Sequence, residues 1–244
     1  MTEPARLAKV IAHRGASGNA PENTLAAISL AHKFGAKCVE LDASISRDNI
    51  PFVHHDNNLD RCTSGSGHLC EQDAAMLDNL SADAGMSAFA GEPLPRVSAA
   101  IALLRDLQMG LNLEIKPAPG LEEKTALAIC DAVRDSWPSE LPLVLSSFSQ
   151  ASLAVARDAL PGAARALIVG AVPDDWRHLT QMLQCRNLHT AAAAIEPSQA
   201  KAITESGLGL YCYTVNEVDN ARKLLAFGVN GVFTDYPAEL LSAL

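Results

Sequence analysis

Eight short apolar segments, nearly all followed by a stretch of helical periodicity, constrain the fold of this chain more than any other feature of its sequence. The segments span residues 9–15, 38–44, 111–117, 141–148, 164–170, 189–195, 209–216 and 231–237. They are continuous apolar runs, which are typical of parallel strands covered on both faces. Eight strand–helix units in about 250 residues predict an α/β fold, the (β/α)8 TIM barrel. A doubly wound sheet is the alternative, but "HRGASG" matches poorly the glycine-rich loop that usually follows its first strand.

The helical stretches fill the gaps between the apolar segments. Over residues 22–34, Ala27, Leu30, Ala31 and Phe34 fall on one helix face, and Gly35 closes the helix. Further helices are expected over residues 98–108, 121–136, 150–159, 174–184, 197–206 and 217–227. With 48% hydrophobic residues, the chain can bury the core of one barrel domain, expected over residues 1–244.

Two segments depart from this repeat after the second strand. Residues 50–56, "IPFVHHD", follow that strand too closely for a crossover helix, so we expect an antiparallel hairpin. If Asp48 and Asn49 are its turn residues, Asp42 pairs with His55, which then shares a face with the second strand's carboxylates, while His54 points away. Residues 57–95, rich in Ser, Gly, Asp and Pro, are expected to form a small insertion or lid subdomain beyond the barrel rim.

Charge and composition exclude several classes of partner. A net charge of −9 argues against nucleic acid and against docking on anionic lipid. No apolar run approaches the ~20 residues that cross a bilayer, and no signal-peptide core is evident, so a cytoplasmic location without stable membrane association is expected. The six cysteines form no Cys-x-x-Cys pair and are expected to be reduced. Cys62 and Cys70 are the one pair to check for a disulfide.

Polar groups gather where the predicted strands end, at the barrel face that carries active sites. Glu40 and Asp42 are two residues apart on one strand, so their carboxylates face the same way. Glu114 occupies the same position on the next barrel strand. Three gathered carboxylates repel one another and raise each other's pKa unless a divalent cation binds them. Oxygen ligands suit Mg²⁺ or Ca²⁺, so one such ion is predicted.

Histidines and cations at the same strand ends suggest acid–base chemistry on an anion. His13 and His55 are the candidate proton carriers, because imidazole titrates near neutral pH. Arg14 and Lys116 are candidates for phosphate binding, with ion pairing to the nearby carboxylates as the alternative. Structural roles are expected for the other histidines, although a β-bulge could exchange His54 with His55.

Six segments, in this order, resemble the signature segments of the glycerophosphodiester phosphodiesterase family. They are "IAHRGASGNAPENTLAAI", "VELDASISRDNIPFVHHDNNLDRCTSG", "LNLEIKP", "VLSSF", "YTVNE" and "GVNGVFTDYP". The resemblance implies a barrel with an insertion after the second strand, and hydrolysis of glycerophosphodiesters to glycerol 3-phosphate and an alcohol with one divalent metal. It implies the metal ligands Glu40, Asp42 and Glu114, the acid/base pair His13 and His55, and the phosphate contacts Arg14 and Lys116.

The match departs from the family pattern at two positions. The family usually has Trp where Tyr213 stands, which concerns the pocket wall that meets the glycerol or alcohol group of the substrate. It usually has Thr where Cys62 follows Arg61.

Several alternatives stay open at this point. The attacking oxygen is either water or the neighbouring glycerol hydroxyl, and His13 as base with His55 as acid is the favoured order. Rival functions are a lysophospholipase D-like phosphodiesterase, a metal-dependent aldolase or isomerase using Lys116, and a barrel that only binds a ligand. The sequence does not specify the head group, the native metal or the oligomeric state, and it is compatible with a homodimer.

Overall fold

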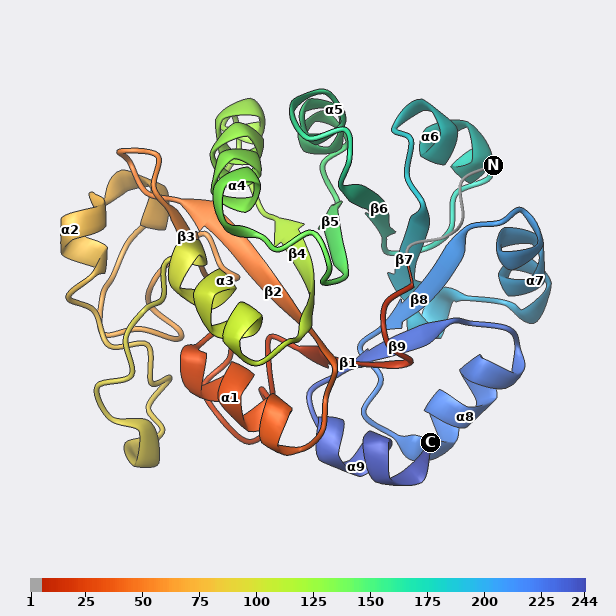
Figure 1. Ribbon diagram of the computed structural model, residues 1–244, viewed down its shortest axis with the longest axis horizontal. Coiled ribbons are helices and arrows are strands. Elements are labelled where there is room, and N and C mark those ends of the chain that lie inside the picture. Colours follow the sequence, from red (N-terminus) through yellow and green to blue (C-terminus); the bar gives the residue numbers. More distant parts are fainter. Residues whose placement is uncertain (1–5) are drawn as a thin grey trace.

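A computed structural model describes residues 6–244, so the first five residues of the expected domain lie outside the description. Eight parallel strands form a closed barrel, because β1 pairs with both β9 and β2. Helices surround the barrel (Figure 1), which confirms the predicted TIM-barrel fold. The barrel strands are β1 (Val10–His13), β2 (Cys38–Ile45), β4 (Gly110–Ile115), β5 (Leu143–Ser147), β6 (Ala164–Val169), β7 (Asn187–Ala191), β8 (Gly209–Tyr213) and β9 (Gly231–Thr234).

The helices follow the predicted pattern with shifted ends. They are α1 (Leu25–Lys33), α2 (Ala74–Leu77), α3 (Val97–Asp106), α4 (Glu122–Ser136), α5 (Gln150–Ala159), α6 (Trp176–Met182), α7 (Pro197–Glu205), α8 (Val218–Ala226) and α9 (Pro237–Ala243). The first helix begins at Leu25 instead of Glu22, because Asn23 has a φ of 60° and Thr24 caps the helix by accepting from the Ala27 amide. The apolar run at 189–195 was wrongly expected to be all strand, since residues 192–194 form a 3-10 turn.

Alternation along the strands sorts the barrel interior into an apolar base and a polar mouth. Ile11, Cys38 and Phe233 belong to an apolar cluster, together with Val144, Ala166 and Tyr211. Two residues further along the same strands or just beyond them stand His13, Glu40 and Asp235. Because side chains two apart share a face, the strands that bury this apolar layer carry polar groups to the mouth. Two larger apolar clusters pack the outer strand faces against the helices.

The hairpin after β2 forms, but its predicted register is wrong by one residue. Ala43 pairs with Val53 on β3 (Pro51–Val53), and the His54 amide donates to the Asp42 carbonyl at 2.9 Å. The loop has three residues, Arg47 to Asn49, and Asn49 adopts a left-handed φ of 63°, as in hairpins longer than two residues. Asp42 therefore lies opposite His54 and not His55, and because β3 ends at Val53 the position of His55 depends on contacts beyond the strand.

Residues 57–95 fold beside the barrel around a small apolar core of their own, with α2 at its edge (Figure 1). That core contains Leu59, Leu69, Leu77 and Leu94, which are all buried and pack with Phe52 of β3. Forked ion pairs of Arg47 with Asp73 and of Arg96 with Asp78 tie the segment to the hairpin and to α3. Cys62 and Cys70 are free thiols, as are the other four cysteines. Over residues 6–244, no helix combines the length and apolar character that crossing a bilayer requires.

Candidate active site

Three carboxylates meet at the mouth of the barrel. The strand register places His13 beside Glu40 and Asp42 beside Glu114. Glu40, Asp42 and Glu114 each offer an oxygen, and these atoms all lie within 4.8 Å of one another. Sequence reasoning predicted this grouping from the period-two spacing on β2 and from the equivalent position on β4.

The cluster is electrostatically costly without a cation. Burial, together with repulsion from Asp42, raises the pKa of Glu114 to about 7. Burial raises the pKa of Glu40 well above its ordinary value, and repulsion from Asp42 and Glu114 adds to the rise. A hard divalent cation would offset both effects, because three carboxylate oxygens are the donor set that Mg²⁺ and Ca²⁺ prefer. The residues present therefore fit such an ion.

Each predicted histidine is held by a carboxylate through the same ring nitrogen. His13 Nδ1 donates to Asp235 Oδ1 at 2.7 Å, and His55 Nδ1 donates to Asp56 Oδ1 at 2.6 Å. Although burial by itself would raise the pKa of Asp235, its hydrogen bonds with His13, Asn216 and Ser17 lower the pKa to about 2. An ionised carboxylate only accepts, so it fixes the tautomer and leaves Nε2 of the ring to exchange protons.

His13 and His55 differ in their surroundings. His13 Nε2 lies 3.9 Å from Glu40 Oε2. His55 is more open, and burial lowers its pKa below the usual histidine value despite opposing attraction from Asp42 and Asp56. His54, by contrast, is buried away from the mouth, where its Nε2 donates to the Asn58 carbonyl at 2.9 Å. His55 therefore lines the pocket at the mouth, whereas His54 does not.

The two predicted phosphate-binding cations flank the carboxylates. Arg14 Nε lies 3.2 Å from Asp42 Oδ2, and Lys116 Nζ lies 3.4 Å from Glu114 Oε1. Arg14 has a left-handed φ of 55°, uncommon for a residue with a side chain, and its amide donates to Glu40 Oε2 at 3.0 Å. Gly15 follows with a φ of 81°, and a Cβ there would lie 2.6 Å from the Ala27 side chain. This tight turn directs Arg14 across the acidic cluster.

One pocket of about 270 Å³ is bordered by six of the predicted site residues: His13, Arg14, Glu40, His55, Glu114 and Lys116. Its wall on the other side is apolar and aromatic, formed by Phe148, Ile168, Tyr213 and Phe233. Tyr213, the predicted substrate contact, packs edge-on against Phe148 and donates its hydroxyl proton to the Val169 carbonyl at 2.9 Å. The pocket thus offers charged groups on one side and an apolar surface on the other.

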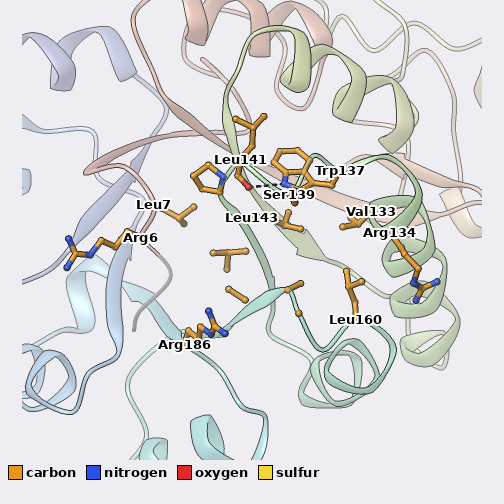
Figure 2. A pocket seen from close by; sticks show the side chains of 15 residues that line it. Arg6, Leu7, Val133, Arg134, Trp137, Ser139, Leu141, Leu143, Leu160 and Arg186 are labelled. Carbon is orange, nitrogen blue, oxygen red and sulfur yellow. Dashed lines mark hydrogen bonds between the residues drawn. The ribbon is translucent and has the colours of Figure 1, made fainter. Parts of the chain in front are cut away.

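A larger hollow of about 470 Å³ lies where strands begin, at the opposite end of the barrel (Figure 2). Arginines 6, 134 and 186 stand at its rim, and Trp137 donates to the Leu141 carbonyl within it. Among residues 6–244, its lining holds no histidine or carboxylate. The chemistry therefore belongs to the mouth at the carboxyl ends of the strands.

Residues 13–239 match the Glycerophosphoryl diester phosphodiesterase family, a range that includes every residue of the mouth described above. The chain belongs to the glycerophosphoryl diester phosphodiesterase family. This confirms the resemblance that the six sequence segments suggested, and it confirms the expectation that the chain is a phosphodiesterase enzyme.

Three relatives show how far the similarity to other glycerophosphoryl diester phosphodiesterases extends. A glycerophosphodiester phosphodiesterase from Caldanaerobacter subterraneus is 32% identical over 241 residues, which cover 96% of each chain. A phosphodiesterase from Oleispira antarctica, solved in complex with the product sn-glycerol-3-phosphate, is 39% identical with a TM-score of 0.95, over 97% of this chain and 96% of the other. A glycerophosphodiester phosphodiesterase from Agrobacterium tumefaciens has a TM-score of 0.79 at 26% identity, over 97% and 100% of the chains.

Sequence reasoning assigned no role to several residues that support the site of this family member. Asn23 Nδ2 donates to Asp42 Oδ2 at 2.8 Å, and Asn23 Oδ1 accepts from the Asp42 amide. Glu22 accepts from Arg14 Nη1 at 2.8 Å. Both residues lie in "PENT", within the first signature segment, which was the available signal. Asp235 lies in the last predicted strand segment, residues 231–237, but nothing in the sequence indicated that it would pair with His13.

Proposed function

We propose that this chain hydrolyses glycerophosphodiesters to glycerol 3-phosphate and an alcohol by metal-dependent acid–base catalysis. The observation that carries the proposal is the convergence of three buried carboxylates and two carboxylate-bound histidines on one pocket. The product bound to the Oleispira antarctica relative supports it, because glycerol 3-phosphate is what this reaction would release.

The proposed metal site consists of Glu40, Asp42 and Glu114. A bound Mg²⁺ or Ca²⁺ would supply positive charge to the phosphate oxygens as negative charge develops on them. Arg14 and Lys116 border the same pocket and would hold the phosphate from the side of the carboxylates. Both cations contact carboxylates of this cluster, which positions them beside the proposed phosphate site.

The proposed proton transfers use Nε2 of each histidine. His13 would remove the proton from the attacking oxygen while His55 protonates the leaving alcohol, each ring being oriented by the carboxylate at its Nδ1. The attacking oxygen is water, or the neighbouring glycerol hydroxyl with a cyclic phosphate as intermediate. A diester that lacks this hydroxyl separates the two routes, because only direct attack by water would still cleave it.

Release of glycerol 3-phosphate from a panel of diesters tests the function directly. We expect turnover with at least one of the choline, ethanolamine, glycerol, inositol or serine diesters, loss of turnover in EDTA, and recovery with Mg²⁺ or Ca²⁺. A lysophospholipid belongs in the panel, with release of its head-group alcohol as the readout because the acyl chain stays on the glycerol phosphate, since lysophospholipase D-like cleavage is the remaining alternative. Turnover of the lysophospholipid alone would replace the proposed substrate class, and turnover unaffected by EDTA would contradict the metal requirement.

The acidic cluster predicts how pH changes stabilisation by the metal. In the metal-free fold, Glu114 keeps its proton up to a pKa of about 7, whereas in the unfolded chain it loses it near 4.5. The folded state therefore binds more protons in this window, and the stability of the metal-free protein falls as pH rises through it. Mg²⁺ removes the repulsion between the ionised carboxylates, so it should raise Tm more at about pH 8 than at about pH 5.

Thermal melts in EDTA and in Mg²⁺ at both pH values measure this difference. The Glu114→Gln variant should lose most of it, because the amide neither titrates nor adds to the repulsion. Glu123→Gln, at an exposed position on α4, is the matched control and should keep it. An equal Mg²⁺ effect at both pH values would contradict the proposed site.

Other expectations stay proposals. We infer that residues 57–95 are an insertion or lid within one domain, supported by their separate apolar core. A cytoplasmic location and a homodimer stay predictions.

A further inference from the structure

One side chain of the 57–95 segment reaches the mouth of the barrel. Arg61 donates two hydrogen bonds to Asp56, from Nε at 2.7 Å and from Nη2 at 2.9 Å. It donates two more to Glu22, from Nη1 at 2.7 Å and from Nη2 at 2.8 Å. The guanidinium thus binds two carboxylates from different parts of the chain, and all three of its nitrogens donate.

The same two carboxylates hold two predicted site residues. Glu22 Oε1 accepts from Arg61 Nη2 and also from Arg14 Nη1 at 2.8 Å. Asp56 Oδ1 accepts from Arg61 Nη2 and also from His55 Nδ1 at 2.6 Å. One nitrogen of Arg61 therefore bridges the two oxygens that orient the candidate phosphate-binding arginine and the candidate acid.

We propose that Arg61 is a positioning residue, which sets the orientation of His55 through Asp56 and of Arg14 through Glu22. The inference rests on the proposed roles of His55 and Arg14 in phosphodiester hydrolysis. Arg61 itself does not line the pocket and half of its side chain is exposed, so it acts through the two carboxylates and not on the substrate. In this way the segment outside the barrel takes part in the geometry of the site.

The geometry favours arginine over lysine at this position. Glu22 and Asp56 would repel each other if brought together alone, and a cation between them removes that repulsion. Four hydrogen bonds to two carboxylates need the rigid guanidinium fork, which the point charge of an ammonium group cannot reproduce. Arg61→Lys should therefore recover only part of the activity lost in Arg61→Ala.

Steady-state kinetics of the metal-loaded enzyme test the proposal. Arg61→Ala should lower kcat/KM by roughly 10- to 100-fold, the range expected when catalytic groups are misplaced by about an ångström. Substituting each carboxylate separately distinguishes the two contacts of Arg61. Asp56→Asn should mainly lower kcat through His55, and Glu22→Gln should mainly raise KM through Arg14. Adding Arg61→Ala to Asp56→Asn should lower kcat further by less than Arg61→Ala does alone, because both act on the same imidazole.

Arg47→Ala is the matched control. Arg47 makes the same forked contact with one carboxylate, Asp73, but at the hairpin loop away from the mouth. We expect Arg47→Ala to leave kcat and KM unchanged, and millimolar guanidinium to restore activity to Arg61→Ala. Normal kinetics in Arg61→Ala, or a loss that neither guanidinium nor Arg61→Lys relieves, would overturn the positioning role.

His55→Ala, measured in the same series, separates this inference from the proposed function. If His55→Ala is inactive while Arg61→Ala has normal kinetics, the positioning role alone is wrong. If His55→Ala keeps near-normal activity, the proposed role of His55 fails, and with it the proposal that Arg61 acts on His55 through Asp56.

Discussion

Replacing either His13 or His55 by alanine is expected to lower kcat by about 10²- to 10⁴-fold, the contribution typical of one general acid or base. Each ring is fixed at Nδ1 by a carboxylate, and alanine removes the oriented Nε2 that would exchange the proton. The remaining turnover would come from substrate binding and charge stabilisation. The measurement is kcat at saturating diester and saturating metal.

The fold should survive both substitutions, because neither ring belongs to the apolar clusters that hold the barrel together. Circular dichroism and Tm verify this. His178→Ala, an exposed position on α6, is the matched control and should keep normal activity. A His13→Ala, His55→Ala double variant only slightly slower than the singles would indicate that the two residues act in one step. Near-normal kcat in either single variant would remove that residue from the mechanism.

Removing one carboxylate of the cluster is expected to have a comparable or larger effect. Glu114→Gln and Asp42→Asn keep the shape of the side chain but take a charge from the proposed metal ligands. Charge stabilisation by a bound metal is worth several kcal/mol, and each ~1.4 kcal/mol is tenfold in rate, so a loss of about three orders of magnitude is expected. Turnover and Mg²⁺ affinity by calorimetry should fall together.

The control for this loss is again Glu123→Gln, which should change neither quantity. EDTA should abolish turnover of the unmodified protein, and added Mg²⁺ or Ca²⁺ should restore it. If Glu114→Gln binds the metal as tightly as the unmodified protein, Glu114 is not a ligand. If metal affinity falls but turnover does not, the metal has a structural role.

The barrel and the acidic cluster could be predicted from the sequence because both follow from local periodicity. Buried parallel strands need continuous apolar runs, and eight such runs are visible along the chain. Glu40 and Asp42 share a face because side chains alternate, and the pairing of β4 with β2 brings Glu114 beside Asp42. The wrong hairpin register had a local cause as well, since a left-handed Asn49 adds one residue to the loop.

What only the tertiary structure decided is how the site residues are held. His13 and Asp235 are 222 positions apart, and Arg61 meets Glu22 across 39 positions. No periodicity relates such residues, because their contact depends on strand β9 closing against β1 and on the fold of residues 57–95. The sequence by itself determined which chemical groups gather at the mouth of the barrel. Which carboxylate orients His13 was decided by long-range packing, because a hydrogen bond depends on ångström-scale positions that local sequence does not encode. Asp56, which orients His55, is its neighbour in the sequence, but its link to Arg61 and Glu22 depends on the same packing.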